Sequence, residues 1–463
     1  MLSFTTKAIT GVRYAVTLSA TLGLLATQSA FGQGAAPAPS PAPAATPAAA
    51  PAPAPAEIKW KPIVTMDNQL YPSYILATAT LTEKAMEMLL PAAPPNLIGD
   101  RNGQLGVEVE TLKPGSTVRV EIRSTRFVKL SSQEVRLEKP GTYRLFPTLE
   151  WSYDDLRTTR EVTPETVTFT VLVNGDEVGS KKLRVTVRSL NDCPFGRKLG
   201  PGETLETKHG EAAVGMPWMF AAYVNEGDPA VDQILKEALA TGIVPAFVGY
   251  QAPPDSVVRE VFAIWTALRE RGIKYSNTPI AAGFSQNMLS QNVRLMGDSL
   301  NYKQSNCVDG SALILGVLRK LGIDGSLMLV PGHCLIAVSL RPEQPFKLGT
   351  VESNNEFREV IFIETTSIGS PPKEQAFIAG LKLLGGNTPR GVPKKYAESY
   401  KNFIGAIAEG FGNGKQTTLT EFGADLARDN ISYVLIPIDY ARKQGIQPVS
   451  YLREAGSSPS GEK

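Results

Sequence analysis

Apolar and polar residues alternate along the first part of the chain. From Glu57 to about Leu190 the pattern repeats every two residues, as in Val118-Arg-Val-Glu-Ile, which is typical of half-buried strands. Lys113-Pro-Gly-Ser and Asn174-Gly175 are turn signals between such runs, and Asn-Gly is a strong hairpin signal. The pattern predicts an all-β sandwich domain over residues 57–190, with a short helix at 82–90.

Beyond residue 210 the apolar residues follow a helical period. Residues 191–212, rich in Gly, Pro and charge, are predicted to form the domain boundary. Further elements are expected in this part, namely helices at 228–241, 255–272, 394–411 and 439–445 and strands at 327–330, 334–340, 360–364 and 431–438. Helices that precede a sheet indicate an α+β domain over residues 210–450, so the chain is predicted to be multidomain.

The stretch from Ser305 to Val338 combines a thiol and an imidazole. Cys307 precedes about four turns of nearly all-apolar helix that Gly322 is placed to end, and His333 begins the strand that follows. A helix that is apolar all round is buried, so Cys307 and Asp309 in its first turn indicate that the helix begins at a cleft. The partial positive charge of a helix N-terminus favours a thiolate there.

Two further expectations concern the orientation of the imidazole. Adjacent residues on a strand face opposite ways, so if His333 faces Cys307, then Cys334 points into the core or toward another cysteine. Glu364 ends the next apolar strand, where an acidic residue is costly unless it is paired. Pairing with His333 would explain Glu364, because a catalytic imidazole needs a third group to orient it.

These residues together resemble the transglutaminase-like superfamily, which has a papain-like cysteine fold. The resemblance rests on the cysteine that begins a central helix, the Leu318-Arg-Lys-Leu-Gly-Ile segment, Gly332-His333 and Glu364-Thr365. It covers about residues 250–370, and the predicted helix at 255–271 with Tyr275 is similar to the segment that the family carries upstream.

The resemblance implies a catalytic triad read along the chain in this order. Cys307 would be the nucleophile, His333 the base and acid, and Glu364 would stand in the place of an aspartate. It further implies an exported hydrolase of cysteine protease or amidase type, or an acyltransferase. Such an enzyme would act on a carboxamide or peptide bond of a protein or peptide substrate, which could be cell-envelope material.

Other interpretations of the same residues stay open. The same fold could serve as a non-catalytic binding or structural module of the cell envelope. A lone cysteine is commonly a small buried hydrophobe, and Asp309 is interpreted as a first-turn helix charge. A charged loop is interpreted as solvated surface, although one of its acids could replace Glu364; its acids are Glu352, Glu356 and Glu359.

Charge and composition narrow the classes of function. The chain has 47 Lys and Arg against 45 Asp and Glu, and Lys7 and Arg13 account for the whole surplus. The remainder is neutral, so a general electrostatic attraction to nucleic acid or to an anionic membrane is not indicated. With only two histidines and no Cys-x-x-Cys, we expect no metal and no cofactor.

The N-terminus is predicted to be an export signal. Lys7 and Arg13 precede an apolar stretch at 14–26 and small residues at the cleavage-site spacing, which predicts a signal peptide over residues 1–32, with an uncleaved anchor as the alternative. Residues 33–56 form an Ala/Pro-rich linker, and residues 455–463 are expected to be a disordered tail. We expect a periplasmic or extracellular protein without a transmembrane span in the mature chain.

Export would permit disulfide formation. The chain has three cysteines, which allow one bond with one thiol left over. The interpretation that keeps Cys307 free pairs Cys193 with Cys334.

Overall fold

The computed structural model describes most of the chain beyond residue 57. The described ranges are 58–90, 92–111, 113–198, 213–276, 285, 287–330, 332–342, 360–412 and 434–450. They belong to one unit, Glu57–Lys463. Several predictions concern residues outside the described ranges: the signal peptide at 1–32, the linker at 33–56, the tail at 455–463, and the acids Glu352, Glu356 and Glu359.

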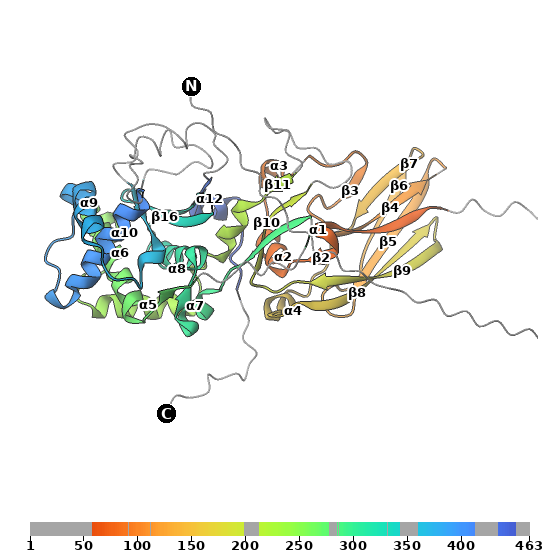
Figure 1. Cartoon of the computed structure of the whole chain (residues 1–463). Helices are drawn as coiled ribbons and strands as arrows, with labels where there is room; N and C mark the ends of the chain where they lie inside the picture. Colours follow the sequence, from red (N-terminus) through yellow and green to blue (C-terminus); the bar gives the residue numbers. More distant parts are fainter. Residues whose placement is uncertain are drawn as a thin grey trace, which may run out of the picture. The chain divides into compact units, whose positions relative to one another are not determined.

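Two sheets form the framework of residues 58–190 (Figure 1). The five-stranded sheet has the order β2 (Gln69–Leu70), β9 (Asp176–Val187), β8 (Thr163–Val173), β5 (Ser116–Ser124) and β6 (Ser131–Leu137). The four-stranded sheet has the order β1 (Trp60–Val64), β4 (Leu105–Thr111), β7 (Gly141–Phe146) and β3 (Leu97–Gly99). Alternate residues of β4 and β5, such as Val107 and Val120, are fully buried in one shared apolar core.

The two predicted turns behave differently. β8 and β9 form the hairpin expected at Asn174-Gly175, where φ is 53° and 93°, the left-handed values that a tight hairpin turn requires. The turn at Lys113-Pro-Gly-Ser also lies between two strands, β4 and β5. Those strands do not pair, because β4 pairs with β1 and β7 whereas β5 pairs with β6 and β8. This turn therefore carries the chain from one sheet to the other.

The prediction of an all-β domain over residues 57–190 is too simple. Besides the short turn α1 (Thr65–Asn68), three short helices lie within this range, α2 (Pro72–Thr78), α3 (Glu83–Leu89) and α4 (Tyr153–Thr158). α3 matches the helix expected at 82–90, and Thr82 caps it by accepting a hydrogen bond from the Ala85 N–H. α2 is buried along its whole length, so it lacks the polar face that would reveal an amphipathic helix in the sequence.

The rest of the described chain forms a second region, which combines helices with a four-stranded sheet. Its antiparallel sheet has the order β17 (Val360–Ile363), β16 (His333–Ser339), β15 (Gly325–Val330) and β18 (Val434–Pro437). The helices are α5 (Pro229–Ala240), α6 (Pro254–Glu270), α7 (Met296–Tyr302), α8 (Cys307–Lys320), α9 (Glu374–Leu384), α10 (Ala397–Gly410) and α12 (Ile438–Lys443). The expected helices α5, α6, α8, α10 and α12 and the four expected strands are present, whereas α7 and α9 were not predicted.

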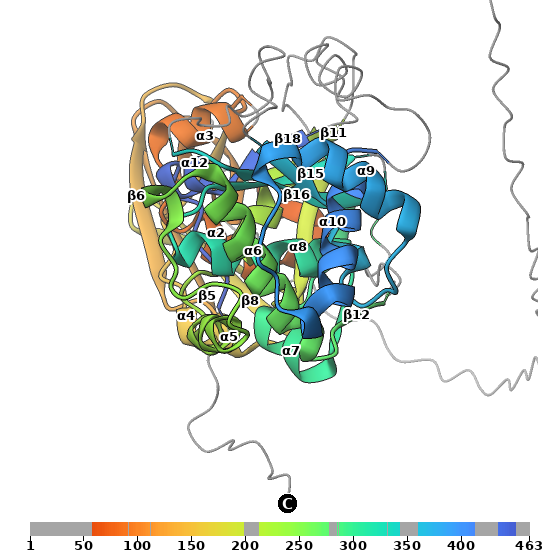
Figure 2. The same cartoon turned by 90° about the vertical axis from the view of Figure 1, so that its left-hand side faces the viewer.

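Helix α8 lies at the centre of this region (Figure 2). It packs against β15 and β16 and against helices α5, α6 and α7. The apolar face of α6 is buried, with Phe262 and Trp265 among its enclosed side chains. The Asp228 side chain accepts a hydrogen bond from the Ala230 N–H at 2.9 Å and so caps α5.

The segment predicted as a domain boundary begins with a strand. β10 (Asp192–Lys198) pairs with β13 (Met288–Asn292) on one side and with β11 (Ala213–Gly215) on the other. The described part of the chain is therefore a mixed α/β protein with several sheets, and the exact boundary between its domains stays a prediction.

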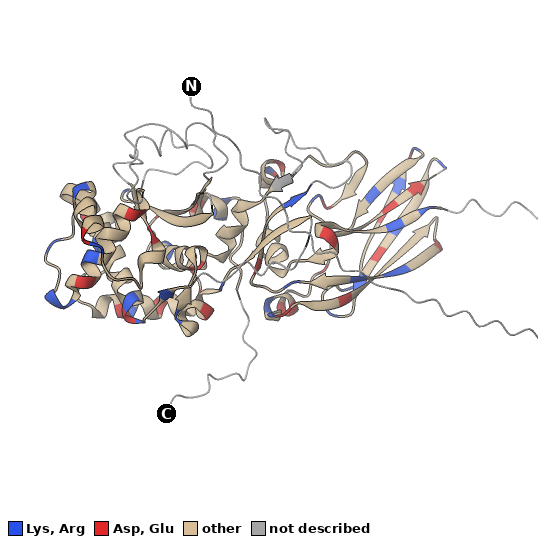
Figure 3. Cartoon of the chain, in the orientation of Figure 1, with Lys and Arg blue, Asp and Glu red and all other residues tan. Residues whose placement is uncertain are grey.

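Charged residues of both signs are interspersed over the described strands and helices, as Figure 3 shows. Within the described residues, no helix is both long and apolar enough to cross a membrane.

Candidate functional site

Cys307 is the first residue of α8. The preceding residue, Asn306, caps the helix: its Oδ1 accepts hydrogen bonds from the N–H groups of Val308 and Asp309 at 2.8 and 2.9 Å. The residues from Val308 to Leu318 are all buried, whereas Cys307 is partly exposed. The buried helix therefore begins at a position where its first side chain remains accessible, as the sequence predicted.

Asp309 completes this helix start. Its carboxylate accepts hydrogen bonds from the Asn306 N–H, from the Arg294 N–H and from the Arg294 guanidinium, all between 2.8 and 2.9 Å. Burial raises the pKa of the Asp309 carboxyl, and these hydrogen bonds oppose that rise. Asp309 is therefore a positioning residue that fixes the turn carrying Cys307, which extends the sequence interpretation of a simple first-turn charge.

His333 begins β16, immediately after a tight connection from β15. Val330 pairs with His333 across this connection, and Gly332 has a φ of 71°, which favours glycine. The His333 Nε2–H donates to Glu364 Oε2 at 2.6 Å, and Cys307 lies close enough to the same ring to raise its pKa. Because Nε2 is engaged by Glu364, Nδ1 is the ring nitrogen available to Cys307.

The two partners of His333 favour its charged form. The hydrogen bond to Cys307 and then that to Glu364 raise the pKa of His333 to about 10, although burial acts in the opposite direction. The imidazole is therefore protonated at neutral pH. The His333 side chain keeps 29% of its surface exposed, against 8% for Glu364, so the imidazole is the group nearer to solvent.

Glu364 follows β17 and is held from two sides. Its Oε2 accepts from His333, while its Oε1 accepts from the N–H of Thr366 at 3.0 Å and from the hydroxyl of Thr366 at 2.6 Å. Burial alone would raise the pKa of the Glu364 carboxyl, but the hydrogen bonds from His333 and Thr366 outweigh it, so the pKa lies below its usual value. The carboxylate is thus ionised and aligned on the imidazole.

Thr365, which lies between Glu364 and Thr366 in the sequence, connects the end of β17 to the start of α8. It begins the short turn η4 (Thr365–Ser367), and its hydroxyl donates to the Cys307 carbonyl at 3.4 Å and lies 3.1 Å from the Ser311 hydroxyl. Thr365 and the first turn of α8 are far apart in sequence, and these contacts hold them together.

The cysteine pairing predicted from the sequence is wrong. Cys193, Cys307 and Cys334 are all free thiols. Cys193 lies on β10 and Cys334 on β16, two different sheets, and the sequence spacing contained no information about that separation. Burial raises the pKa of the Cys193 and Cys334 thiols well above the usual value. Cys307 is partly exposed, so it is the accessible thiol of the three.

The orientation expected for Cys334 is confirmed, because its side chain is buried while the adjacent His333 reaches Cys307 and Glu364. Tyr275 also lies near the site. It ends β12 (Lys274–Tyr275), which runs parallel to β14 (Gln304–Ser305) just before Cys307. Burial and then the charges of Cys307 and Glu364 raise the pKa of Tyr275, although 44% of the residue remains exposed. The sequence offered no signal for this proximity beyond the resemblance of its segment.

Comparisons with known proteins do not assign the chain to a family. No protein-family model matches the chain, and no curated protein matches it. Among the described residues, no group of three or more His, Cys, Asp and Glu side chains is arranged to hold a metal ion.

Proposed function

We propose that the chain is a cysteine enzyme of transglutaminase-like type that acts on a carboxamide or peptide bond. The observation that carries the proposal is His333, which donates a hydrogen bond to Glu364 and lies close enough to Cys307 for that residue to raise the pKa of the imidazole. A thiol, an imidazole and a carboxylate in that order form the arrangement that nucleophilic acyl chemistry uses.

In this proposal the Cys307 sulfur attacks the carbonyl carbon of the substrate. As the tetrahedral intermediate collapses, the C–N bond breaks and His333 donates its proton to the departing ammonia or amine. Water then transfers a proton to His333 while its oxygen attacks the thioester, and the C–S bond breaks to release the acid. A lysine amine in place of water would instead give acyl transfer.

The helix start supplies one donor for the oxyanion. Asn306 already accepts from the N–H groups of Val308 and Asp309, and the Gly310 N–H donates to the Asn306 carbonyl. The Cys307 N–H is therefore the donor of this turn that has no partner among the described residues. It lies next to the attacking sulfur, where an oxyanion forms.

Alkylation of Cys307 tests the proposal without a known substrate. With iodoacetamide at neutral pH, Cys307 in the folded protein should react at least about tenfold faster than a free peptide thiol. His333→Gln should remove most of this advantage, whereas Cys193→Ser should leave the labelling unchanged because Cys193 is buried. A parent protein whose Cys307 reacts no faster than the peptide would refute the enzyme proposal.

Enzymatic activity is then assayed by incubating the protein with peptide mixtures and measuring the ammonia released and the new amino termini formed. The parent should release them and Cys307→Ala should not, with both proteins showing the same melting temperature. Lost activity in a folded Cys307→Ala assigns the chemistry to the thiol.

A non-catalytic binding module is the second candidate, and one observation favours it. Oxyanion holes commonly use more than one donor, and the capping by Asn306 leaves this helix start with a single N–H of its own. This candidate predicts that a ligand captured by the parent is captured equally well by Cys307→Ala. If Cys307→Ala loses ligand capture as well as alkylation by iodoacetamide, the binding-module candidate is contradicted.

A further inference from the structure

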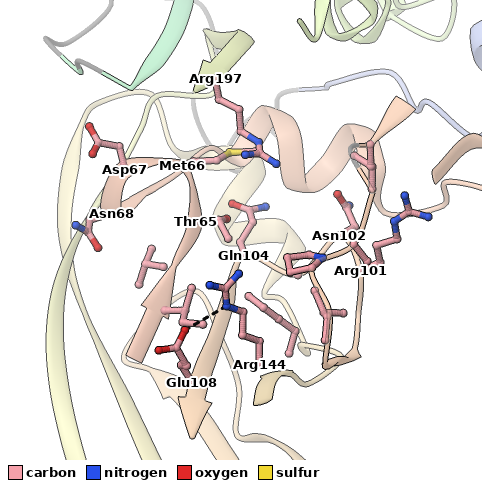
Figure 4. A pocket seen from close by; sticks show the side chains of 18 of the residues that line it. Thr65, Met66, Asp67, Asn68, Arg101, Asn102, Gln104, Glu108, Arg144 and Arg197 are labelled. Atoms are coloured by element: carbon pink, nitrogen blue, oxygen red, sulfur yellow. Dashed lines mark hydrogen bonds and ion pairs between the residues drawn. The ribbon is translucent and has the colours of Figure 1, made fainter. Parts of the chain in front are cut away.

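A cavity of about 550 Å³ lies away from the three residues of the candidate site, none of which lines it. It is formed by β1, β4 and β7 with the segment from Thr65 to Asn68, and by the ends of β10 and β13 (Figure 4). This volume is within the range of pockets that hold small organic molecules.

The lining carries more positive than negative side chains. Its cations are Lys61, Arg101, Arg144, Arg197 and Lys198, and its carboxylates are Asp67 and Glu108. Glu108 pairs with Lys61 at 2.7 Å and with Arg144 at 3.2 Å, so one carboxylate serves two cations. In Figure 4, Arg197 and Arg144 extend into the cavity from different strands, with Gln104 between them. The cavity therefore has a positive interior.

Part of the same wall is apolar. Its members are Ile63, Val64, Met66, Leu97 and Phe146. Gln104 is 4% exposed, and the Glu108 and Arg144 side chains are 20% and 22% exposed, so this ion pair is partly sheltered from bulk water, whereas the Lys61 side chain is 66% exposed. Charge attraction is stronger in such surroundings than on an open surface.

The rim of the cavity includes a strained turn. Met66, Asp67 and Asn68 have φ values of 52°, 62° and 57°, so three consecutive residues other than glycine adopt the left-handed conformation. The Asp67 carboxylate holds this turn by accepting from the Ser285 hydroxyl at 2.6 Å and from the Asn287 side chain at 2.9 Å. Strained backbone of this kind is concentrated at binding and catalytic sites, because it persists only where the surroundings impose it.

We propose that this cavity binds a small organic anion, in which a carboxylate or phosphate group is joined to an apolar body. The two N–H groups on one edge of a guanidinium match two oxygens of a carboxylate or phosphate, and the apolar wall covers the remainder of the ligand. The volume and the apolar wall suit a small molecule, whereas a polyanion would need a groove that follows its backbone.

Calorimetric titration of the full chain with three eight-carbon probes tests the proposal. Octanoate and octyl phosphate present the two anionic groups, and octan-1-ol presents the same apolar chain without a charge. At least one anion should bind about tenfold or more tightly than the alcohol, and the tighter of the two anions identifies the preferred group. Binding of the alcohol as tight as that of both anions, or no binding of either anion, would overturn the proposal.

Variants locate the binding within the protein. Arg197→Gln and Arg144→Gln should each weaken binding of the preferred anion on the order of tenfold, because each removes a charged donor. Arg136→Gln is the matched control, because Arg136 lies on β6, is 69% exposed and does not line the cavity. An equal loss in the control would contradict the location, and the three-probe comparison on the parent decides the proposal even if a variant fails to fold.

Discussion

His333 carries two hydrogen bonds, and each favours the protonated ring. The Cys307 bond is the larger influence and the Glu364 bond the second, and together they hold the pKa of His333 at about 10. An imidazole that stays charged at neutral pH can hold a thiolate beside it and can donate a proton to a leaving group. The same feature also links the site to the stability of the fold.

The pKa of His333 can be measured directly, because the chain has only two histidines. Proton NMR should show one imidazole that titrates near pH 10, and His333→Gln assigns it. Glu364→Gln removes the carboxylate that favours the charged ring, so the pKa of His333 should fall by about one unit or more.

Glu409→Gln is the matched control for this titration, because the Glu409 side chain is equally buried at 8% exposure and bonds Lys373 and Ser367 rather than His333. Since the pKa of folded His333 lies above its unfolded value, its stabilising contribution is complete below pH 6.5 and disappears as the pH rises toward 10. A folded parent in which His333 titrates near pH 6.5 would contradict the charged-ring arrangement.

At the scale of single residues, the sequence predicted the direction of side chains better than the distances between them. Strand alternation correctly separated the roles of His333 and Cys334, because that rule depends only on local backbone geometry. The disulfide between Cys193 and Cys334 was wrong, because it required a distance between two sheets that spacing along the chain does not contain. The pairing of His333 with Glu364 was expected because an acidic residue at the end of an apolar strand needs a partner, and the family resemblance supplied the complete set with Cys307.

Among the elements, the first turn of α8 is held more firmly than that of α5. Both turns contain an aspartate, but Asp309 is 1% exposed and bonds Arg294 and Asn306, whereas the Asp232 side chain is 70% exposed and lies 3.4 Å from Lys320. The difference lies in burial, because a buried charge pair loses more when one partner is removed.

Asp309→Ala should therefore lower the free energy of unfolding by about 3 kcal/mol. Asp232→Ala should lower it by less than about 1 kcal/mol, since an exposed pair contributes little. Urea denaturation of the two variants measures the difference. Similar small losses in both would show that the capping arrangement does not anchor Cys307.

Elements with a strong local signal were predicted from the sequence. The Asn174-Gly175 hairpin formed because its φ values are set by those two residues. The turn at 113–116 indicated a reversal but not which sheet receives the next strand, a choice made by packing in the core. The left-handed turn at Met66–Asn68 contains no glycine and had no signal, because hydrogen bonds from Ser285 and Asn287 impose it.

At the scale of the whole molecule, the last described segment is bonded to much earlier ones. β18 pairs with β15 and covers the edge of the sheet that carries His333. Beyond it, the Gln447 N–H donates to the Ala77 carbonyl and the Val449 N–H to the Ala222 carbonyl. The Arg442 guanidinium adds ion pairs with Glu226 at 3.2 Å.

A chain that stops after residue 433 should lose this support. The lost segment includes Leu435, Ile436 and Ile438, which are buried to 2% exposure or less, and removal of their contacts costs on the order of 5 kcal/mol. The buried Cys334 thiol should then react with a thiol reagent within minutes. A chain that stops after residue 450 keeps these contacts and should show the slow reaction of the parent; equal reactivity of the two would contradict the prediction.

The order of strands in this sheet also bears on biosynthesis. A ribosome delivers β15 and β16 together, but β18 emerges only after α9 and α10 have been made. During that interval a nascent chain presents β15 as an open sheet edge, which is a template for strand addition by another copy. The yield of the protein made in a foreign host is therefore expected to depend on how quickly translation passes from α10 to β18.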